Sequence, residues 1–441
     1  MVHSLRFRPA RAFAAVLVLA ALLGGSVPAR GDQVRLLDTV LEAAASRVEG
    51  VLGAKREILT STFLVGDDPF SLGALALLRN AARRGISVKL LIDSQWNKIP
   101  VAVQAHLVDE GIEIRTYHPF VWGNLHWLTR RLHDKLVIVD GEVLIAGGRN
   151  IESPYFGLGP AQMGVRNYLD CDIEVRGALA AEARAYFLAL WDSHHVKERN
   201  RSASFAAKAE AARRLDAYQA WLDARIATAR KAGVPLLDPP TPVEHLRFLH
   251  DPIGRKDQER GVGPELLARL NTARVSIAIE SPYLIPTRAF RRGLARALER
   301  GVKVRILTNS LSTTDNLWAQ AGYVGSERRL VKSGIELWEY HGEESLHSKV
   351  AVIDGRWLVV GSFNLDPRSE YLNSEIAVEV DSPELVAAEQ AVMAAHLASS
   401  WRIDERGLPE GASERFPGIP KAKVRKLRWL KLLAPLIRSQ L

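Results

Sequence analysis

The sequence predicts an α/β fold made of two similar lobes, because of its length and an internal repeat. At 441 residues the chain is too long for one ordinary domain. Residues 81–85 lead into the apolar run 86–92, and residues 297–301 lead into the apolar run 302–307. Each segment has the pattern of a helix that ends at a glycine and is followed by a buried strand. We therefore expect two lobes, each a mixed β-sheet flanked by helices.

The boundaries of the lobes follow from the prolines between them. Pro235, Pro239, Pro240 and Pro242 lie together, so we place the first lobe at residues 30–234 and the second at 235–402. Residues 202–232 have apolar side chains at helical spacing and predict an amphipathic helix that covers the lobes. Residues 403–441 are expected to form a linker and a basic amphipathic tail.

The N-terminus has the pattern of a targeting segment. Arg6, Arg8 and Arg11 precede an apolar run at residues 12–23, and small residues end at Ala29. We therefore expect residues 1–29 to be a signal peptide or an N-terminal anchor, although the run is short for a membrane span. Cys171 is the one cysteine, so no internal disulfide can form, and its apolar surroundings predict a buried side chain.

The net charge of +9 is concentrated at the two ends of the chain. Residues 421–441 carry seven basic and no acidic residues, and the N-terminal segment carries three arginines, so the rest is close to neutral. This disfavours a nucleic-acid partner, which requires a basic face. The tail predicts a helix suited to an anionic membrane surface, with a helix packed on the body as the alternative. Its apolar stripe consists of Val424, Leu427, Leu430, Leu433 and Ile437.

Two copies of one motif lie at equivalent places in the repeat. Each copy has a histidine, a lysine two residues later, and an aspartate five residues after the lysine. A Gly-Gly or Gly-Ser pair begins seven residues after the aspartate, and an asparagine follows this pair after one intervening residue. A single His-x-Lys would carry no information, but two copies with identical spacing are a strong signal. The residues are His133, Lys135, Asp140, Gly147, Gly148 and Asn150 in the first copy, and His347, Lys349, Asp354, Gly361, Ser362 and Asn364 in the second.

The motif suits attack on a phosphodiester. In a strand, histidine and lysine at positions i and i+2 point to the same face, and the four apolar residues after each lysine are typical of a buried strand. Two lobes can therefore bring two imidazoles and two ammonium groups together. These supply a nucleophile, an acid for the leaving oxygen and cations for the phosphoryl oxygens. We expect one shared active site that uses no metal and no cofactor.

These motifs resemble those of the phospholipase D superfamily, and within it the bacterial cardiolipin synthases of the C type. The resemblance spans nearly the whole chain after residue 29. The segments that carry it are residues 147–151, 155–157, 308–311, 314–315, 321–323 and 361–369.

The resemblance implies a role for each motif residue. It implies that His133 forms a phosphohistidine and that His347 protonates the leaving alkoxide. Asp170 and Glu375 occupy matching repeat positions and are expected to accept the Nδ1 protons of the two histidines. The lysines and asparagines of the motifs are expected to bind phosphoryl oxygens: Lys135, Lys349, Asn150 and Asn364. Asp140 and Asp354 are expected to support strand-end turns. Gly147 and Gly148 should allow a close backbone approach beside the phosphate, and Gly361 and Ser362 are their structural counterparts.

The resemblance further implies phosphatidyl transfer to a hydroxyl of phosphatidylglycerol, making cardiolipin, at the periplasmic face of the cell membrane. The donor would be phosphatidylglycerol or phosphatidylethanolamine. One alternative is an exported phospholipase D, in which water is the acceptor and phosphatidic acid is the product. A nuclease and an inactive membrane scaffold are less favoured, because the body is nearly neutral and both motifs are intact.

Overall fold

The computed structural model describes residues 31–120, 122, 129–159, 165–199, 201–231, 236–254, 261–434, 437 and 440. The predicted targeting segment lies outside these residues. Within the described part of the chain, no helix combines the length and the apolar character needed to cross a membrane.

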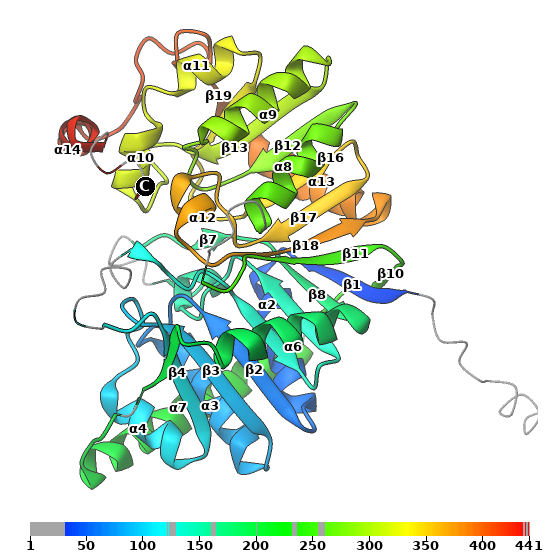
Figure 1. The fold of residues 1–441 in the computed structure, drawn as a ribbon. Coiled ribbons are helices and arrows are strands. Elements are labelled where there is room, and N and C mark those ends of the chain that lie inside the picture. Colours follow the sequence, from blue (N-terminus) through cyan, green and yellow to red (C-terminus); the bar gives the residue numbers. More distant parts are fainter. Residues whose placement is uncertain are drawn as a thin grey trace, which may run out of the picture.

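The first lobe contains a nine-stranded mixed sheet (Figure 1). Its centre is parallel, from β2 through β3 to β4, and the other neighbouring strands are antiparallel. In spatial order the strands are β10 (Thr241–Val243), β1 (Asp32–Leu37), β8 (Asp172–Arg176), β6 (Val143–Gly147), β5 (Leu136–Val139), β2 (Glu57–Thr62), β3 (Ser87–Asp93), β4 (Ile112–Tyr117) and β9 (Val196–Glu198).

The second lobe repeats this arrangement strand for strand in an eight-stranded sheet. It has a counterpart for each strand of the first sheet except β10, so the predicted duplication extends through the whole sheet. In spatial order the strands are β11 (Leu246–His250), β18 (Ile376–Asp381), β17 (Trp357–Gly361), β16 (Val350–Ile353), β12 (Ser276–Glu280), β13 (Lys303–Asn309), β14 (Glu336–Tyr340) and β19 (Ser400–Arg402).

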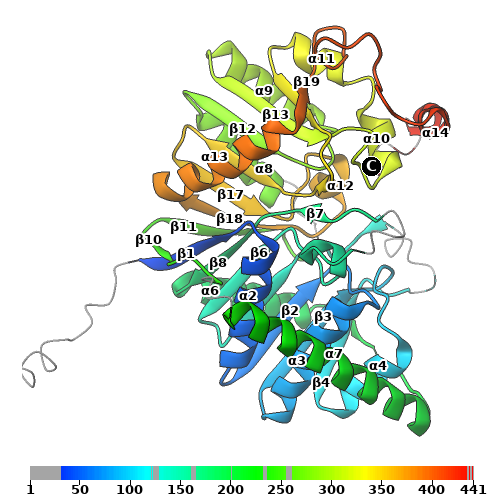
Figure 2. The ribbon, with the colours of Figure 1, turned by 180° about the vertical axis from the view of Figure 1, so that it is seen from behind.

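Both faces of each sheet are buried, which explains the continuous apolar runs after the motif lysines. In β16, Val350 and Val352 belong to a core shared by the two lobes, whereas Ala351 and Ile353 belong to the core beneath the helices of the second lobe. The shared core also contains apolar residues of α6 (Ala178–Trp191) and α13 (Pro383–Ala398). The two sheets thus pack against each other, with helices outside them (Figures 1 and 2).

The outer helices complete two further cores. Those of the first lobe are α2 (Val40–Gly53), α3 (Pro69–Arg83), α4 (Val101–Asp109) and α7 (Phe205–Lys231). Those of the second lobe are α8 (Val262–Thr272), α9 (Arg288–Glu299), α10 (Leu317–Tyr323), α11 (Glu327–Lys332) and α14 (Lys421–Leu433). Helix α12 (Pro367–Tyr371) follows the second motif.

Two predicted features differ in detail from the structure. The change of lobe falls after Val243 rather than at Pro235, because β10 still pairs with β1. Pro242 is tolerated there because β10 is an edge strand, where a missing N–H costs no ladder bond. Helix α7 lies on the first lobe alone (Figure 2), where Leu215 and Leu222 join the core formed with α3 and α4.

Candidate active site

The motif aspartates hold turns rather than substrate. Asp140 and Asp354 each have a φ of 55° and follow β5 and β16. The Asp140 carboxylate accepts hydrogen bonds from three consecutive backbone N–H groups at residues 55–57, and Asp354 does the same at residues 274–276. A carboxylate that satisfies three backbone donors ties the end of the motif strand to the start of its neighbour. These turns lie at the opposite end of each strand from the histidine.

Two short parallel pairings between the lobes position the histidines. Strand β15 (Ser345–Leu346) pairs with β7 (Tyr168–Leu169), which lies between the lobes in Figures 1 and 2, and Leu132 forms an isolated bridge with Ser374. The His347 N–H donates to the Leu169 carbonyl at 2.7 Å, and the His133 N–H donates to the Ser374 carbonyl at 3.1 Å. Asp170 follows Leu169 in the sequence, and Glu375 follows Ser374. Each histidine therefore lies beside a carboxylate residue of the other lobe.

The carboxylates consequently bind the histidines crosswise. His133 Nδ1 lies 2.8 Å from Glu375 Oε2, and His347 Nδ1 lies 2.6 Å from Asp170 Oδ2. The sequence predicted both carboxylates, but not that each would come from the opposite lobe. With Nδ1 engaged in both rings, Nε2 is the nitrogen left to react. One half of the site cannot orient its histidine without the other lobe.

Burial and these partners set the protonation of the pairs. Burial lowers the pKa of His133 to about 4, against the opposing pull of Glu375, and burial together with Lys349 lowers the pKa of His347. Burial opposes ionisation of Glu375 and Asp170, but their histidine and lysine neighbours hold the pKa of each carboxyl below its usual value. Before substrate binds, neutral imidazoles therefore face ionised carboxylates at neutral pH, and the His133 Nε2 lone pair is free to attack.

The motif lysines lie beside their own histidines. Lys135 Nζ donates to the His133 carbonyl at 2.7 Å, and Lys349 Nζ lies 3.2 Å from His347 Nε2. Burial lowers the pKa of Lys135 to about 7 and that of Lys349 to about 8. An anionic phosphodiester between them would favour the charged form of both lysines.

The two motif asparagines have different surroundings. Asn150 Nδ2 donates to the Tyr155 hydroxyl at 2.9 Å, and its Oδ1 accepts from the Leu64 N–H at 3.2 Å. Asn364 Oδ1 is buried and has no hydrogen-bond partner among the described residues. Because a buried acceptor without a partner is costly, this oxygen is suited to a hydrogen-bond donor on a ligand, such as a hydroxyl.

The glycine pairs closely approach neighbouring strands and a carboxylate. A Cβ on Gly147 would lie 2.2 Å from Asp172 Oδ1, and one on Gly361 would lie 2.3 Å from the Ile376 carbonyl oxygen. A Cβ on Gly148 would lie 2.1 Å from Asp170 Oδ1. At the equivalent place in the second lobe, the Ser362 hydroxyl donates to Glu375. The glycines thus make room for β8, β18 and the Asp170 carboxylate.

Several residues contact the histidines without having been predicted to do so. The Tyr155 hydroxyl lies 3.4 Å from His347 Nε2, and Tyr155 comes from the 3₁₀ helix η1 (Ser153–Phe156). The Phe63 ring packs edge-on against His133, with ring centres 5.5 Å apart. Tyr155 belongs to a segment that carries the family resemblance. Neither Tyr155 nor Phe63 lies in a spacing pattern that indicates contact with the histidines.

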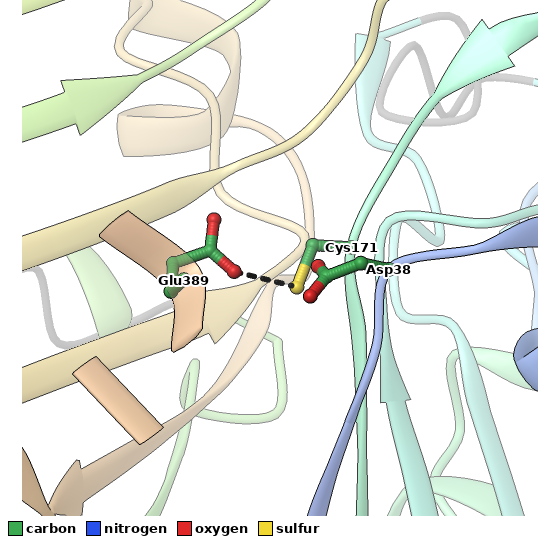
Figure 3. Close-up of side chains that lie close together, drawn as sticks. All are labelled: Asp38, Cys171 and Glu389. Atoms are coloured by element: carbon green, nitrogen blue, oxygen red, sulfur yellow. Dashed lines mark hydrogen bonds between the residues drawn. The ribbon is translucent and has the colours of Figure 1, made fainter. Parts of the chain in front are cut away.

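One group among the described residues has the composition of a metal site. It lies between the lobes, at Cys171, the residue that follows Asp170. It consists of Asp38, Cys171 and Glu389 (Figure 3). Cys171 is buried, as expected, and its Sγ lies 3.7 Å from Glu389 Oε2. Burial raises the pKa of all three groups, which favours their neutral forms and so favours hydrogen bonds among them. We interpret the group as a hydrogen-bonded contact between the lobes.

The duplicated fold and the two crossed histidine–carboxylate pairs define an enzyme of the phospholipase D superfamily. The family model described as "Cardiolipin synthase, PLD-like domain" matches residues 51–191 and 266–397, which is more than half of the chain. The protein therefore belongs to this cardiolipin synthase-like family of phosphatidyltransferases.

Similar proteins support this membership. Cardiolipin synthase C of Escherichia coli (strain K12) is 29% identical over 390 residues, covering 79% of this chain and 81% of that protein. Cardiolipin synthase B of Salmonella typhi is 26% identical over 358 residues, covering 78% and 75%. The crystal structure of phosphatidylserine synthase from Haemophilus influenzae Rd KW20 has a TM-score of 0.68 at 16% identity and covers 93% of this chain and 95% of that one, which shows a shared fold.

Proposed function

We propose that the protein transfers a phosphatidyl group through a phosphohistidine to a glycerol hydroxyl of phosphatidylglycerol, making cardiolipin. The observation that carries the proposal is the crossed pairing, which engages Nδ1 of both His133 and His347 and leaves Nε2 of each ring to react. The names of the similar proteins support cardiolipin as the product. Residues 1–29 support action at the periplasmic face of the membrane, and we expect the protein in the periplasmic or membrane fraction after osmotic shock.

We infer a part for each group in this reaction. His133 Nε2 forms a bond to phosphorus while the bond to the headgroup oxygen breaks, and Glu375 stabilises the resulting imidazolium. His347, protonated once the anionic substrate is bound, gives its proton to the departing oxygen. It then takes a proton from the incoming hydroxyl, whose oxygen displaces His133. Lys135, Lys349 and the Asn364 amide lie where they can stabilise charge on the phosphoryl oxygens.

The acceptor is tested by the products from mixed vesicles. Water is abundant, but an alcohol held in place gains an effective molarity of about 10⁵ M or more, which is enough to outcompete it. Purified protein with vesicles of phosphatidylethanolamine and phosphatidylglycerol should yield cardiolipin with little phosphatidic acid. If phosphatidic acid dominates even with excess phosphatidylglycerol, the enzyme is a phospholipase D and the proposed acceptor is wrong.

We also propose that α14 binds an anionic membrane, but through a face that shares only Leu433 with the predicted stripe. Leu427 is only 1% exposed, and Val424, Leu430 and Ile437 pack with it on the core of the second lobe, beside α10 (Figure 1). The opposite face exposes Trp429 (67%), Leu432 (70%) and Leu433 (49%). Exposed basic residues flank this second apolar face: Lys421, Arg425, Lys426, Arg428 and Lys431.

Replacing Trp429, Leu432 and Leu433 with serine should weaken binding to phosphatidylglycerol vesicles by roughly 30-fold or more, because each buried apolar side chain contributes about 1–3 kcal/mol. Turnover of a soluble phosphodiester should be retained. Vesicle sedimentation measures the binding, and Phe205→Ser, which removes an exposed apolar residue from the first lobe, is the control. Deleting the helix is a poorer test, because it would uncover the core around Leu427. Unchanged vesicle binding by the triple variant would contradict the proposal.

A further inference from the structure

Each motif has a buried carboxyl and a buried hydroxyl behind it, and the two groups exchange places between the lobes. In the first copy, Asp134 lies between the motif histidine and lysine, and Ser61 lies on β2. In the second copy, Ser348 lies between them, and Glu280 lies on β12. Ser61 and Glu280 have the same register, opposite the first residue of β5 and of β16. All four side chains are buried, so the exchange gives the two motif lysines unequal surroundings.

The carboxyl of the second copy is balanced by a basic side chain of its own. Glu280 accepts a hydrogen bond from the Ser348 hydroxyl, and its Oε1 lies 2.9 Å from His396 Nδ1. Burial opposes the charged form of His396, but Glu280 outweighs it and raises the pKa of this histidine. Burial also lowers the pKa of Lys349, and Asp170 is the carboxylate that opposes this most. The second lysine therefore relies on the site itself rather than on the carboxyl behind its strand.

The carboxyl of the first copy has a neutral partner instead. The Tyr186 hydroxyl, from α6, donates to Asp134 Oδ2 at 2.6 Å, and Asp134 Oδ1 has no hydrogen-bond partner among the described residues. Burial raises the pKa of Asp134 to about 6, the hydroxyls of Tyr186 and Ser374 oppose this rise, Glu375 adds to it, and Lys135 opposes it. Asp134 is therefore ionised at neutral pH, and Lys135 is the cation that acts on it.

Lys135 responds to this charge. Burial lowers the pKa of Lys135 to about 7, and Glu375, Asp170 and Asp134 all oppose that effect. As the pH rises, Asp134 loses its proton before Lys135 does, so the negative charge is present where the lysine would otherwise become neutral. Because an opposite charge nearby favours the charged form, Asp134 extends the pH range in which Lys135 can stabilise a phosphoryl oxygen.

We propose that Asp134 is a positioning residue of the first motif, which keeps Lys135 charged while the neutral imidazole of His133 attacks phosphorus. The inference rests on the proposed function and adds a residue to its first step. Neighbouring residues of an extended segment point to opposite sides, and Asp134 points to Tyr186 in the core shared by the lobes. It therefore acts through Lys135 rather than on the substrate. The two motifs have identical spacing, but only the first has this charge.

The test is the alkaline limb of kcat/KM plotted against pH for a soluble phosphodiester, since kcat/KM reports groups of the free enzyme. Asp134→Asn keeps the shape of the side chain and can still accept the Tyr186 hydrogen bond, but it removes the charge. The limb should move to lower pH by about one unit, as expected when a nearby opposite charge is lost. Asp134→Ser gives the first motif the residue of the second and should act in the same way, even if the asparagine variant folds poorly. Sulfate keeps its charge across this range, so its inhibition constant should show the same displacement.

Two controls separate charge from structure. Ser348→Ala alters the equivalent position of the second motif and should leave the limb in place. Tyr186→Phe removes the hydrogen bond to Asp134 but keeps its carboxyl, so it should move the limb less than Asp134→Asn does. An unmoved limb in folded Asp134 variants would overturn the inference, as would an equal displacement by Tyr186→Phe. A soluble phosphodiester and sulfate require no lipid acceptor, so these results can be obtained even if the proposed transfer fails.

Discussion

Replacing His133 with alanine is expected to abolish the covalent phosphoenzyme and to lower turnover by at least about 10⁴-fold, because no other imidazole among the described residues pairs with Glu375. His347→Ala should lower turnover by about 10²–10⁴-fold, the usual cost of losing a general acid. A donor with a nitrophenol leaving group needs little protonation, so it should partly rescue the His347 variant alone. Acid-labile phosphate on the trapped protein and release of nitrophenol measure the two steps.

The control for these variants is His341→Ala, since His341 stacks on Trp401 rather than belonging to either pair. Rescue of the His133 variant by the good leaving group, with none for the His347 variant, would reverse the two roles. Activity should also survive EDTA. Loss of activity that added metal restores would contradict the metal-free reaction.

The crossed pairing makes a second prediction of comparable size. Asp170→Asn should behave as a weaker form of His347→Ala, and Glu375→Gln as a weaker form of His133→Ala. Each amide keeps the shape but no longer stabilises the imidazolium, and we expect losses in kcat of about 10²–10⁴-fold. The nitrophenol donor should therefore rescue Asp170→Asn and not Glu375→Gln.

This pattern separates the crossed arrangement from pairing within each lobe, which would give the opposite result. Asp381→Asn is the matched control, because Asp381 lies at the other end of β18 from Glu375 and forms an ion pair with Arg356 at the surface. Unfolding temperatures of all three variants check that the fold is retained. Equal rescue of both active-site variants would show that the carboxylates act only by supporting the structure.

Helix α14 shows how far amphipathic spacing alone can be interpreted. The predicted stripe of Val424, Leu427, Leu430, Leu433 and Ile437 was correctly spaced for a helix, but an apolar stripe has the same pattern whether it packs on protein or on lipid. Val424, Leu427, Leu430 and Ile437 pack on the apolar surface of the second lobe, whereas Leu433 is 49% exposed. The second apolar face was not apparent, because Trp429 and Leu432 lie among the basic residues along the helix.

Local pattern determined the duplicated α/β fold, the motif strands and the residues of the site. A histidine and lysine two apart share a strand face, and the apolar residues after them require burial on both sides, so these features are encoded within a few neighbouring positions. The same is true of Asp140 and Asp354, whose turns depend on residues at the strand ends. Only the tertiary structure decided which carboxylate serves which histidine. Those contacts join residues 177 positions apart for His347 and Asp170, and 242 positions apart for His133 and Glu375. These contacts depend on how the two sheets pack and on the short parallel pairings between the lobes. The spacing of residues within one lobe does not predict either of them.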